Sequence, residues 1–189
     1  MQPGTTVSRR PAVFLDRDGT VTVPLSRGTY VVEPANLRLV SGAAAAIARL
    51  NEAGTDAVVV TNQRWISRPN GSVSTYLRVH KRLCFLLAEQ GARLDGHYYC
   101  PHPMWSCGCR KPAAGMLLAA ARLGGYDLST SALIGDSDVD LRASRTAGVT
   151  AIRIGAGYVS PNKTWDYAAV DLSSAVDTAL ELIASGRSR

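Results

Sequence analysis

Two aspartates one residue apart, Asp16 and Asp18, follow an apolar run at residues 12–15. The run has the character of a buried strand, and Gly19 allows the chain to turn directly after it. One carboxylate at such a position can attack phosphorus, while the other protonates the leaving alcohol and then activates water. Two carboxylates facing a phosphate also require a divalent cation, and magnesium prefers oxygen ligands. By itself, the segment fits phosphoryl transfer and a simple polar turn equally well.

Other segments of the chain supply the remaining groups that phosphoryl transfer needs. Thr61 and Asn62 end a second apolar run and offer a hydroxyl and an amide for hydrogen bonds to phosphoryl oxygens. Arg110 and Lys111 supply two cations, and Asp136 ends a third apolar run. Ligands of doubly wound sheets collect at the carboxyl ends of parallel strands. We therefore expect these residues to meet in space.

A cysteine-rich segment precedes the two cations. Cys100, His102, Cys107 and Cys109 form a C-x-H-x4-C-x-C cluster, and three thiolates with one imidazole suit a tetrahedral structural zinc. A disulfide is the less favoured alternative, because no signal peptide indicates an oxidising compartment. Cys84 stands apart in a helical apolar pattern, as a small buried residue would. Zinc at the cluster would order a loop that leads directly into the cations.

Taken in order, these motifs resemble those of the haloacid dehalogenase (HAD) superfamily of phosphatases. The matching positions are residues 16–20, Thr61, Lys111 and Asp136. The resemblance extends over roughly residues 11–157, and the ordered set is far more specific than any single motif. It implies an HAD-like fold and a phosphatase that requires magnesium.

The resemblance also implies a role for each carboxylate. Asp16 would be the nucleophile and Asp18 the general acid and base, with a phospho-aspartate as the intermediate. Magnesium would be held by Asp16, Asp136 and the main-chain carbonyl of Asp18. Asp140 is a weaker candidate that would lie just outside the ligands, since carboxylates also suit the start of a helix. Arg17, between the two aspartates, is expected to point away from them and form a structural pair.

A cluster that runs into Cys-Arg-Lys-Pro is similar to two branches of the superfamily, the D-glycero-D-manno-heptose 1,7-bisphosphate phosphatases and the histidinol-phosphate phosphatases. The segment at residues 95–102 favours the heptose branch. Heptose phosphatases usually have Ser-Gly where this chain has Arg64-Trp65, and their loop between His102 and Cys107 is commonly longer than four residues. The heptose bisphosphate is the favoured substrate, and histidinol phosphate or another sugar phosphate stays open.

Four basic residues lie beside the motifs: Arg64, Arg68, Arg110 and Lys111. Together they suit a small substrate that carries more than one phosphate. We expect Arg64 and Trp65 to sit at the mouth of the site, where they would add a cation and a flat surface. The site would then select its substrate through the surrounding loops.

The order of apolar and helical patterns predicts an α/β fold with a doubly wound parallel sheet. Strands are expected at residues 11–15, 57–61, 97–99, 132–134 and 150–154, and helices at residues 42–51, 73–90, 113–123, 138–147 and 173–184. No stretch between the motifs is long enough for a large cap domain. We expect one phosphatase domain at residues 11–184, with flexible tails at 1–10 and 185–189.

Composition narrows the function classes further. With 189 residues, of which 46% are hydrophobic, the chain can bury one full core. It has no apolar run long enough to cross a bilayer, so a cytoplasmic location without a membrane partner is expected. The net charge of +6 is dispersed over the tails and one helix, which disfavours nucleic acid as a partner. A catalytically silent, zinc-containing binding module is the remaining alternative, and the joint presence of all the chemical motifs argues against it.

Overall fold

A six-stranded parallel sheet forms the centre of the computed structural model, which describes residues 9–26, 29–155 and 165–186. The strand order is β3-β2-β1-β4-β5-β6. The strands are β1 Ala12–Leu15, β2 Asp56–Asn62, β3 Gly96–Cys100, β4 Ala132–Gly135, β5 Thr150–Ile154 and β6 Tyr167–Ala169. All five neighbouring pairs are parallel. The expected doubly wound α/β fold is confirmed.

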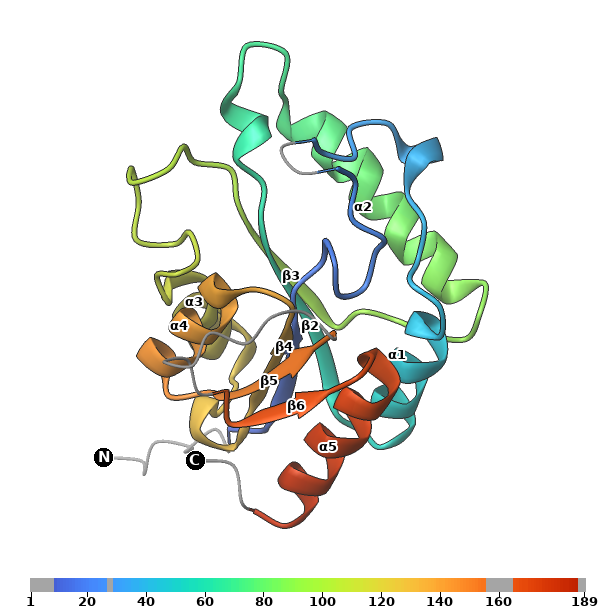
Figure 1. Ribbon diagram of the computed structural model, residues 1–189, viewed down its shortest axis with the longest axis vertical. Coiled ribbons are helices and arrows are strands. Elements are labelled where there is room, and N and C mark those ends of the chain that lie inside the picture. The colour runs from blue at the N-terminus through green and yellow to red at the C-terminus, as the bar shows by residue number, and fades with distance from the viewer. Residues whose placement is uncertain (1–8, 27–28, 156–164, 187–189) are drawn as a thin grey trace, which may run out of the picture.

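Helices cover both faces of the sheet (Figure 1). The α-helices are α1 Ala43–Glu52, α2 Val73–Ala88, α3 Gly115–Gly124, α4 Asp138–Ala147 and α5 Leu172–Ala184, and three short 3-10 helices are η1 Pro34–Asn36, η2 Arg64–Ser67 and η3 Leu128–Thr130. Helices α1, α2 and α5 pack on one face, and α3 and α4 on the other. The result is a three-layer arrangement with two apolar cores.

Strand β1 is buried on both of its faces. Val13 and Leu15 point into the core beneath α1, α2 and α5, whereas Ala12 and Phe14 point into the core beneath α3 and α4. Successive side chains of a strand face opposite sides, so a strand covered on both faces must be apolar throughout. Asp16 is therefore the first polar residue beyond β1, and it emerges at the carboxyl edge of the sheet.

The chain path makes β1 the switch point of the sheet. From β1 the chain proceeds outward to β2 and β3, and then returns to place β4 on the opposite side of β1. Leu15 lies beside Val59 of β2 and Ile134 of β4, and the Asp16 N–H donates to the Ile134 carbonyl at 3.0 Å. A switch point opens a crevice at the carboxyl ends of the strands. Asp16 stands in this crevice.

The elements agree with the predicted ranges to within a few residues, and the differences lie at the ends and in short elements. Strand β6 and the 3-10 helices were not expected, because segments of three or four residues carry too little periodicity to be recognised. Among the described residues, only η1 and α1 separate β1 from β2, and only η2 and α2 separate β2 from β3. Neither segment forms a domain over the crevice.

The tails expected at residues 1–10 and 185–189 lie largely outside the described residues. Arg10 is described, and it contacts the body of the protein: its guanidinium pairs with Asp56 at 2.7 Å, and its carbonyl accepts from the Asp127 N–H at 2.9 Å. In the part of the chain that the structure describes, no helix is long and apolar enough to cross a membrane.

Two histidines stack between α2 and β3. The rings of His80 and His97 lie 3.7 Å apart between centroids, and Cys84 Sγ is 3.5 Å from His80 Nε2. Cys84 is therefore half-buried beside a polar ring, not buried in the apolar core as its sequence context predicted. Burial and the neighbouring ring lower the pKa of His80 to about 4, and burial also lowers the pKa of His97.

The stacked pair predicts that the protein loses stability in mild acid. Because the folded pKa of His80 lies below the ordinary value of 6.5, the stabilising contribution of the neutral ring is complete above pH 6.5. That contribution falls as the pH drops towards about 4. We expect His80→Phe to flatten this part of the profile in chemical denaturation at several pH values. Identical pH profiles for His80→Phe and the unaltered protein would show that burial of His80 has no part in it.

Candidate active site

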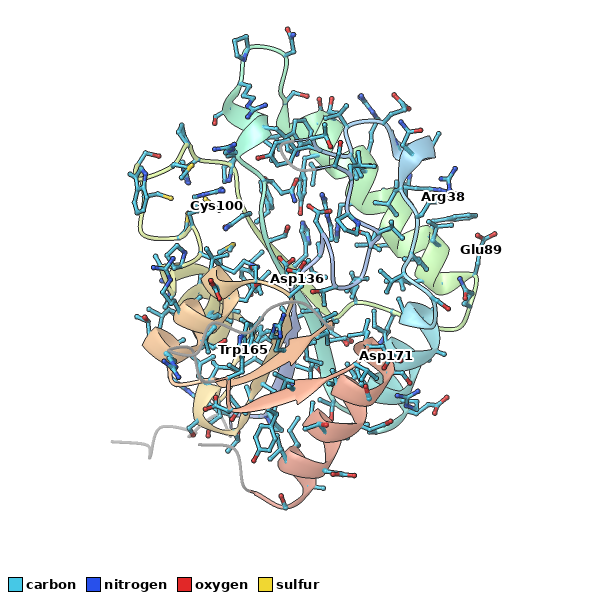
Figure 2. All side chains as sticks on the ribbon, in the orientation of Figure 1. Arg38, Glu89, Cys100, Asp136, Trp165 and Asp171 are labelled. Atoms are coloured by element: carbon cyan, nitrogen blue, oxygen red, sulfur yellow. The ribbon has the colours of Figure 1, made fainter. Side chains whose placement is uncertain are left out.

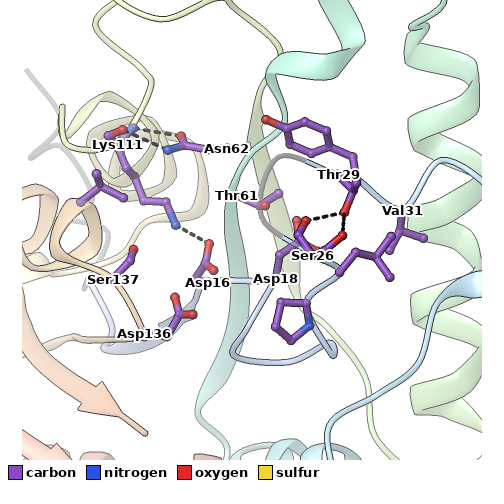
Figure 3. Close-up of a pocket in the computed structure, with 14 residues that line it drawn as sticks. Asp16, Asp18, Ser26, Thr29, Val31, Thr61, Asn62, Lys111, Asp136 and Ser137 are labelled. Carbon is purple, nitrogen blue, oxygen red and sulfur yellow. Dashed lines mark hydrogen bonds and ion pairs between the residues drawn. The ribbon is translucent and has the colours of Figure 1, made fainter. Parts of the chain in front are cut away.

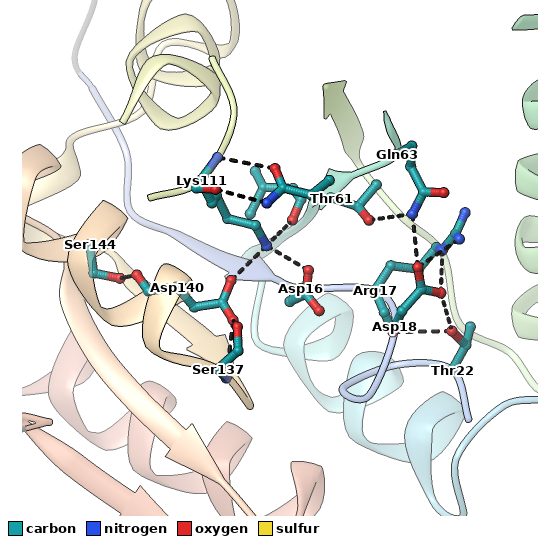
Figure 4. A network of polar contacts seen from close by, with 12 residues as sticks. Asp16, Arg17, Asp18, Thr22, Thr61, Gln63, Lys111, Ser137, Asp140 and Ser144 are labelled. Atoms are coloured by element: carbon teal, nitrogen blue, oxygen red, sulfur yellow. Dashed lines mark hydrogen bonds and ion pairs between the residues drawn. The ribbon is translucent and has the colours of Figure 1, made fainter. Parts of the chain in front are cut away.

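The ammonium group of Lys111 lies at the centre of the crevice, and three elements hold it (Figure 4). Its Nζ is 2.5 Å from Asp16 Oδ1, 2.6 Å from Asp140 Oδ1 and 2.8 Å from the Val60 carbonyl oxygen. Lys111 is only 3% exposed, and Asp140 is fully buried. Burial alone would lower the pKa of Lys111, but the two carboxylates outweigh it and raise that pKa. The site thus contains a permanently charged cation.

Three carboxylates surround this single cation. Asp16, Asp136 and Asp140 each offer an oxygen, and these oxygens lie within 4.8 Å of one another. Burial raises the pKa of Asp16 to about 7 against the opposing effect of Lys111, and burial together with Asp140 raises the pKa of Asp136. Because three carboxylates face one cation, the site in its ionised form carries more negative charge than Lys111 can compensate.

An all-oxygen donor set with excess negative charge fits a magnesium ion. Asp140 is already engaged, because one of its oxygens contacts Lys111 and the other accepts from the Ser137 N–H and hydroxyl. Asp16 and Asp136 have oxygens left to bind a metal. Asp140 instead holds the ammonium group of Lys111 in place. It therefore lies just outside the set of residues that could bind a metal.

The turn after β1 packs closely against Asp136. Gly19 has a φ of +96°, and a Cβ atom there would lie 2.1 Å from Asp136 Oδ2. Any side chain at position 19 would therefore be both strained and in collision with this carboxylate. The glycine lets the ends of β1 and β4 approach each other.

Asp18 has its own set of partners on the far side of Asp16. Arg17 is fully buried and donates to both oxygens of Asp18 at 2.9 Å. The expectation that Arg17 points away from the two aspartates is therefore wrong, because its structural pair is formed with Asp18 itself. Gln63 Nε2 donates at 2.8 Å, and the Thr22 hydroxyl lies 3.2 Å away. Burial would raise the pKa of Asp18, but Arg17 and these hydrogen bonds outweigh it and lower that pKa. Asp18 is therefore ionised in the free protein.

A cavity of about 420 Å³ opens over these groups (Figure 3). It brings together most of the residues that the sequence singled out: Asp16, Asp18, Thr61, Asn62, Lys111 and Asp136. Its opposite wall comes from the segment that follows β1, including Leu25, Ser26, Thr29 and Tyr30. The site is thus a polar floor at the strand ends with a wall formed by one loop.

Asn62 differs from its expected part in phosphate binding. Its Nδ2 donates to the Lys111 carbonyl at 2.9 Å, and its Oδ1 accepts from the Lys111 N–H at 3.0 Å. The carboxamide lines the cavity but is anchored to the main chain of Lys111 on both sides. Asn62, the last residue of β2, therefore holds the main chain of Lys111 in position.

Arg64 and Arg68 also differ from expectation, because neither lines the cavity over Asp16. Arg64 Nε donates to the Tyr30 hydroxyl at 2.8 Å and its Nη1 lies 2.9 Å from Met104 Sδ, while the Arg68 guanidinium lies 5.4 Å from the centre of the Tyr30 ring. Both cations contact the wall residue Tyr30. Trp65 is 3% exposed, so it offers no flat surface at the mouth.

Arg110 belongs to a second, adjoining cavity of about 340 Å³. This cavity shares Asn62 and Lys111 with the first one, and Arg142 and Trp105 also line it. Arg110 Nη1 is buried and has no hydrogen-bond partner among the described residues. Trp105 is 87% exposed and forms part of this wall. Beside the main site, one guanidinium nitrogen of Arg110 is thus left to bind a ligand.

The cysteine cluster begins with Cys100 at the end of β3 (Figure 2) and continues in the loop that leads to Lys111. The sulfur atoms of Cys100, Cys107 and Cys109 lie 3.3–3.5 Å apart, and His102 Nδ1 is 3.2 Å from Cys109 Sγ. All four cysteines of the chain are described, and none forms a disulfide. Tetrahedral zinc with Zn–S bonds of about 2.3 Å requires sulfur separations of roughly 3.8 Å. The observed sulfur separations are shorter than this spacing, but the four donors are gathered in one place and their types suit such an ion.

Two participants of the site carried weak signals in the sequence. Asp140 follows Asp136 by four residues at the start of a helix, a position that carboxylates occupy for other reasons. Gln63 is fully buried between Asp18 and Thr61, yet in the sequence it was only one amide in a polar triplet. Their partners lie elsewhere in the chain, so no local pattern could identify them.

Comparison with known proteins places these features in a family. The family model described as HAD-hydrolase-like matches residues 108–175. The D-glycero-beta-D-manno-heptose-1,7-bisphosphate 7-phosphatase of Rhodopseudomonas palustris is 37% identical over 153 residues, which cover 77% of this chain and 83% of that protein. The enzyme of the same name from Escherichia coli is 38% identical over 147 residues, which cover 74% and 75%.

A solved structure agrees with these relatives. The crystal structure of D,D-heptose 1,7-bisphosphate phosphatase from B. bronchiseptica, complexed with magnesium and phosphate, superposes with a TM-score of 0.80. It is 30% identical, and the match covers 90% of this chain and 98% of that one. The chain belongs to the HAD phosphatases. It is thus an enzyme, a phosphoric monoester hydrolase, and the resemblance seen in its motifs is confirmed.

In this HAD phosphatase the loop that carries the cysteine cluster packs tightly against the start of α3. A Cβ atom at Gly115 would lie 2.4 Å from the Gly108 carbonyl oxygen and 2.8 Å from Cys109 Cα. We expect Gly115→Ala to push the loop away, to lower the free energy of unfolding by about 1–3 kcal/mol and to weaken metal retention. Thermal unfolding and metal release to a chelator measure both effects.

Gly108→Ala is the matched control, because nothing lies within 4 Å of a Cβ atom at that position. It should retain its metal and its stability. Equal behaviour of the two variants would contradict the tight contact between the loop and α3.

Proposed function

We propose that this HAD phosphatase removes the 7-phosphate of D-glycero-D-manno-heptose 1,7-bisphosphate with the help of magnesium. The observation that carries the proposal is the cluster of Asp16, Asp136 and Asp140 around Lys111, in a chain similar to the heptose phosphatases named above. The relatives from R. palustris and E. coli are named for the beta anomer, so we propose that anomer first.

Asp16 is proposed as the nucleophile. Its carboxylate would attack phosphorus in line, forming a bond from the Asp16 oxygen to phosphorus while the bond from phosphorus to the sugar oxygen breaks. Magnesium bound by Asp16, Asp136 and the main-chain carbonyl of Asp18 would supply positive charge that offsets the negative charge of the phosphate. Lys111 supplies a fixed cation beside Asp16, and Thr61 lines the same cavity with its hydroxyl. Both would stabilise the phosphoryl oxygens.

Asp18 is proposed as the general acid and base. A bound phosphate brings negative charge next to Asp18, which raises the pKa of that carboxyl and lets it carry the proton that the departing sugar oxygen takes up. The ionised form that results matches the state of Asp18 in the free protein. It can then accept a proton from the water that hydrolyses the phospho-aspartate.

The second phosphate of the substrate requires its own cation. Arg110 lines the cavity that adjoins the site, and its buried Nη1 has no partner in the part of the chain that the structure describes. Arg142 lines the same cavity. We propose that Arg110 binds this phosphate, which makes a small bisphosphorylated sugar the partner of the site. Arg64 and Arg68 contribute through Tyr30, whose ring they support.

Zinc is proposed as a structural ion at Cys100, His102, Cys107 and Cys109. Three thiolate ligands need reduced cysteines, so we propose that the protein works in the cytoplasm. We also propose that residues 11–184 act as a single phosphatase domain.

The proposed function predicts that Asp16→Asn abolishes turnover. Lys111 keeps its ion pair with Asp140 in this variant, so the fold should persist while the nucleophile is lost. Phosphate release with magnesium should be measured for both anomers of heptose 1,7-bisphosphate and for histidinol phosphate. Asp127→Asn makes the same chemical change outside the site and should retain activity.

The outcomes of this assay separate the alternatives. Release from a heptose bisphosphate that is lost in Asp16→Asn supports the proposal and identifies the anomer. A preference for histidinol phosphate would make the short loop between His102 and Cys107 the better guide to the substrate. Substantial hydrolysis by Asp16→Asn would exclude the covalent scheme.

A further inference from the structure

We propose that Trp65 is a positioning residue whose indole N–H fixes the Gln63 carboxamide, so that Gln63 donates to Asp18 and Thr61 at the same time. Trp65 Nε1 donates to Gln63 Oε1 at 2.7 Å. Gln63 Nε2 lies 2.8 Å from Asp18 Oδ2 and 2.9 Å from Thr61 Oγ1 (Figure 4). The kinetic part of this inference rests on the proposed phosphatase function.

The chemistry of the indole decides which way the amide faces. An indole N–H can donate but cannot accept, whereas a carboxamide offers one oxygen and one NH2 group. The reversed amide would set the Gln63 NH2 against the Trp65 N–H, and its oxygen against the Asp18 carboxylate. Both contacts would be repulsive, so only the observed orientation satisfies Trp65 and Asp18 together.

Burial makes this orientation costly to change. Gln63 is fully buried, and Trp65 is 3% exposed in an apolar cluster with Ile66 and Tyr76. Water is excluded from the contact, so a rotated amide would leave polar groups without partners. Trp65 thus acts as a fixed donor on the side of Gln63 that faces away from the crevice.

The amide orientation also sets the direction of the Thr61 hydroxyl. Thr61 is 1% exposed, and its Oγ1 accepts from Gln63 and lines the cavity over Asp16. Among the described residues, the Thr61 hydroxyl donates to no acceptor. Its proton is therefore available for a phosphoryl oxygen. Gln63 meanwhile holds Asp18, together with Arg17, in the rotamer that the structure shows.

Trp65 follows Arg64 directly in the sequence. The structure gives the pair separate tasks, with Arg64 on the wall residue Tyr30 and Trp65 beneath the catalytic floor.

A double-mutant cycle on Trp65 and Gln63 tests the inference. Trp65→Phe keeps an aromatic ring and removes the N–H, and we expect kcat to fall about tenfold with little change in KM, as for one hydrogen bond near a charged group. In a Gln63→Met background, Trp65→Phe should cause no further loss, because the amide that it positions is gone. Tyr76→Phe is the matched control from the same cluster: it removes a hydroxyl that bonds to none of the described residues, and kcat should be unchanged. Additive losses in the double variant would overturn the proposal.

Nuclear magnetic resonance provides a test that needs no substrate. The chain has three tryptophans, and the indole N–H signal of Trp65 is the one that Trp65→Phe removes. Gln63→Met should move this signal upfield and accelerate its exchange with water, whereas Tyr76→Phe should leave it in place. An unmoved signal in Gln63→Met would overturn the proposal.

If Gln63→Met does not fold, the side-chain amide signals of Gln63 provide the test instead. These signals should shift in Trp65→Phe and stay fixed in Tyr76→Phe. The reverse result would contradict the proposed positioning of Gln63 by Trp65. A protein that hydrolyses none of the phosphates would refute the proposed function, and the indole signal would then decide the role of Trp65.

Discussion

The buried ammonium group of Lys111 is the constraint on which the rest of the site depends. A charge taken out of water must be compensated by partners, and removing one partner of a buried pair costs about 3–5 kcal/mol. Asp16, Asp140 and the Val60 carbonyl provide that compensation from three different elements. Because each element must reach the same nitrogen atom, the ends of β1 and β2 and the start of α4 are held in one place.

Two further contacts, away from the ammonium group, fix the position of Lys111. Asn62 binds the main chain of Lys111 on both sides, and the cysteine cluster closes the loop that leads into it. Groups that are fixed before the substrate arrives do not have to reorganise as charge moves in the reaction. The same logic applies on the other side of Asp16, where Arg17 and Gln63 hold Asp18.

The sequence indicated the fold well because its signals are local. A strand covered on both faces must be apolar over its whole length, so Phe14 and Val59 and their neighbours marked the central strands. Helical periodicity marked the covering layers, and short elements such as β6 escaped because three residues show no period. The metal and phosphate motifs were visible for a similar reason, since each is a short run of specific residue types.

The sequence by itself determined which residues we propose to carry the chemistry: the aspartates, Lys111 and the cluster of three cysteines and one histidine stand out by type and spacing. Only the tertiary structure decided what their neighbours do. It anchored Asn62 to a main chain 49 residues away, turned Arg64 towards Tyr30 and buried Trp65 beneath Gln63. The physical reason is that a polar side chain takes the partner that packing brings within hydrogen-bond reach. That partner depends on how distant segments meet, which no local pattern encodes.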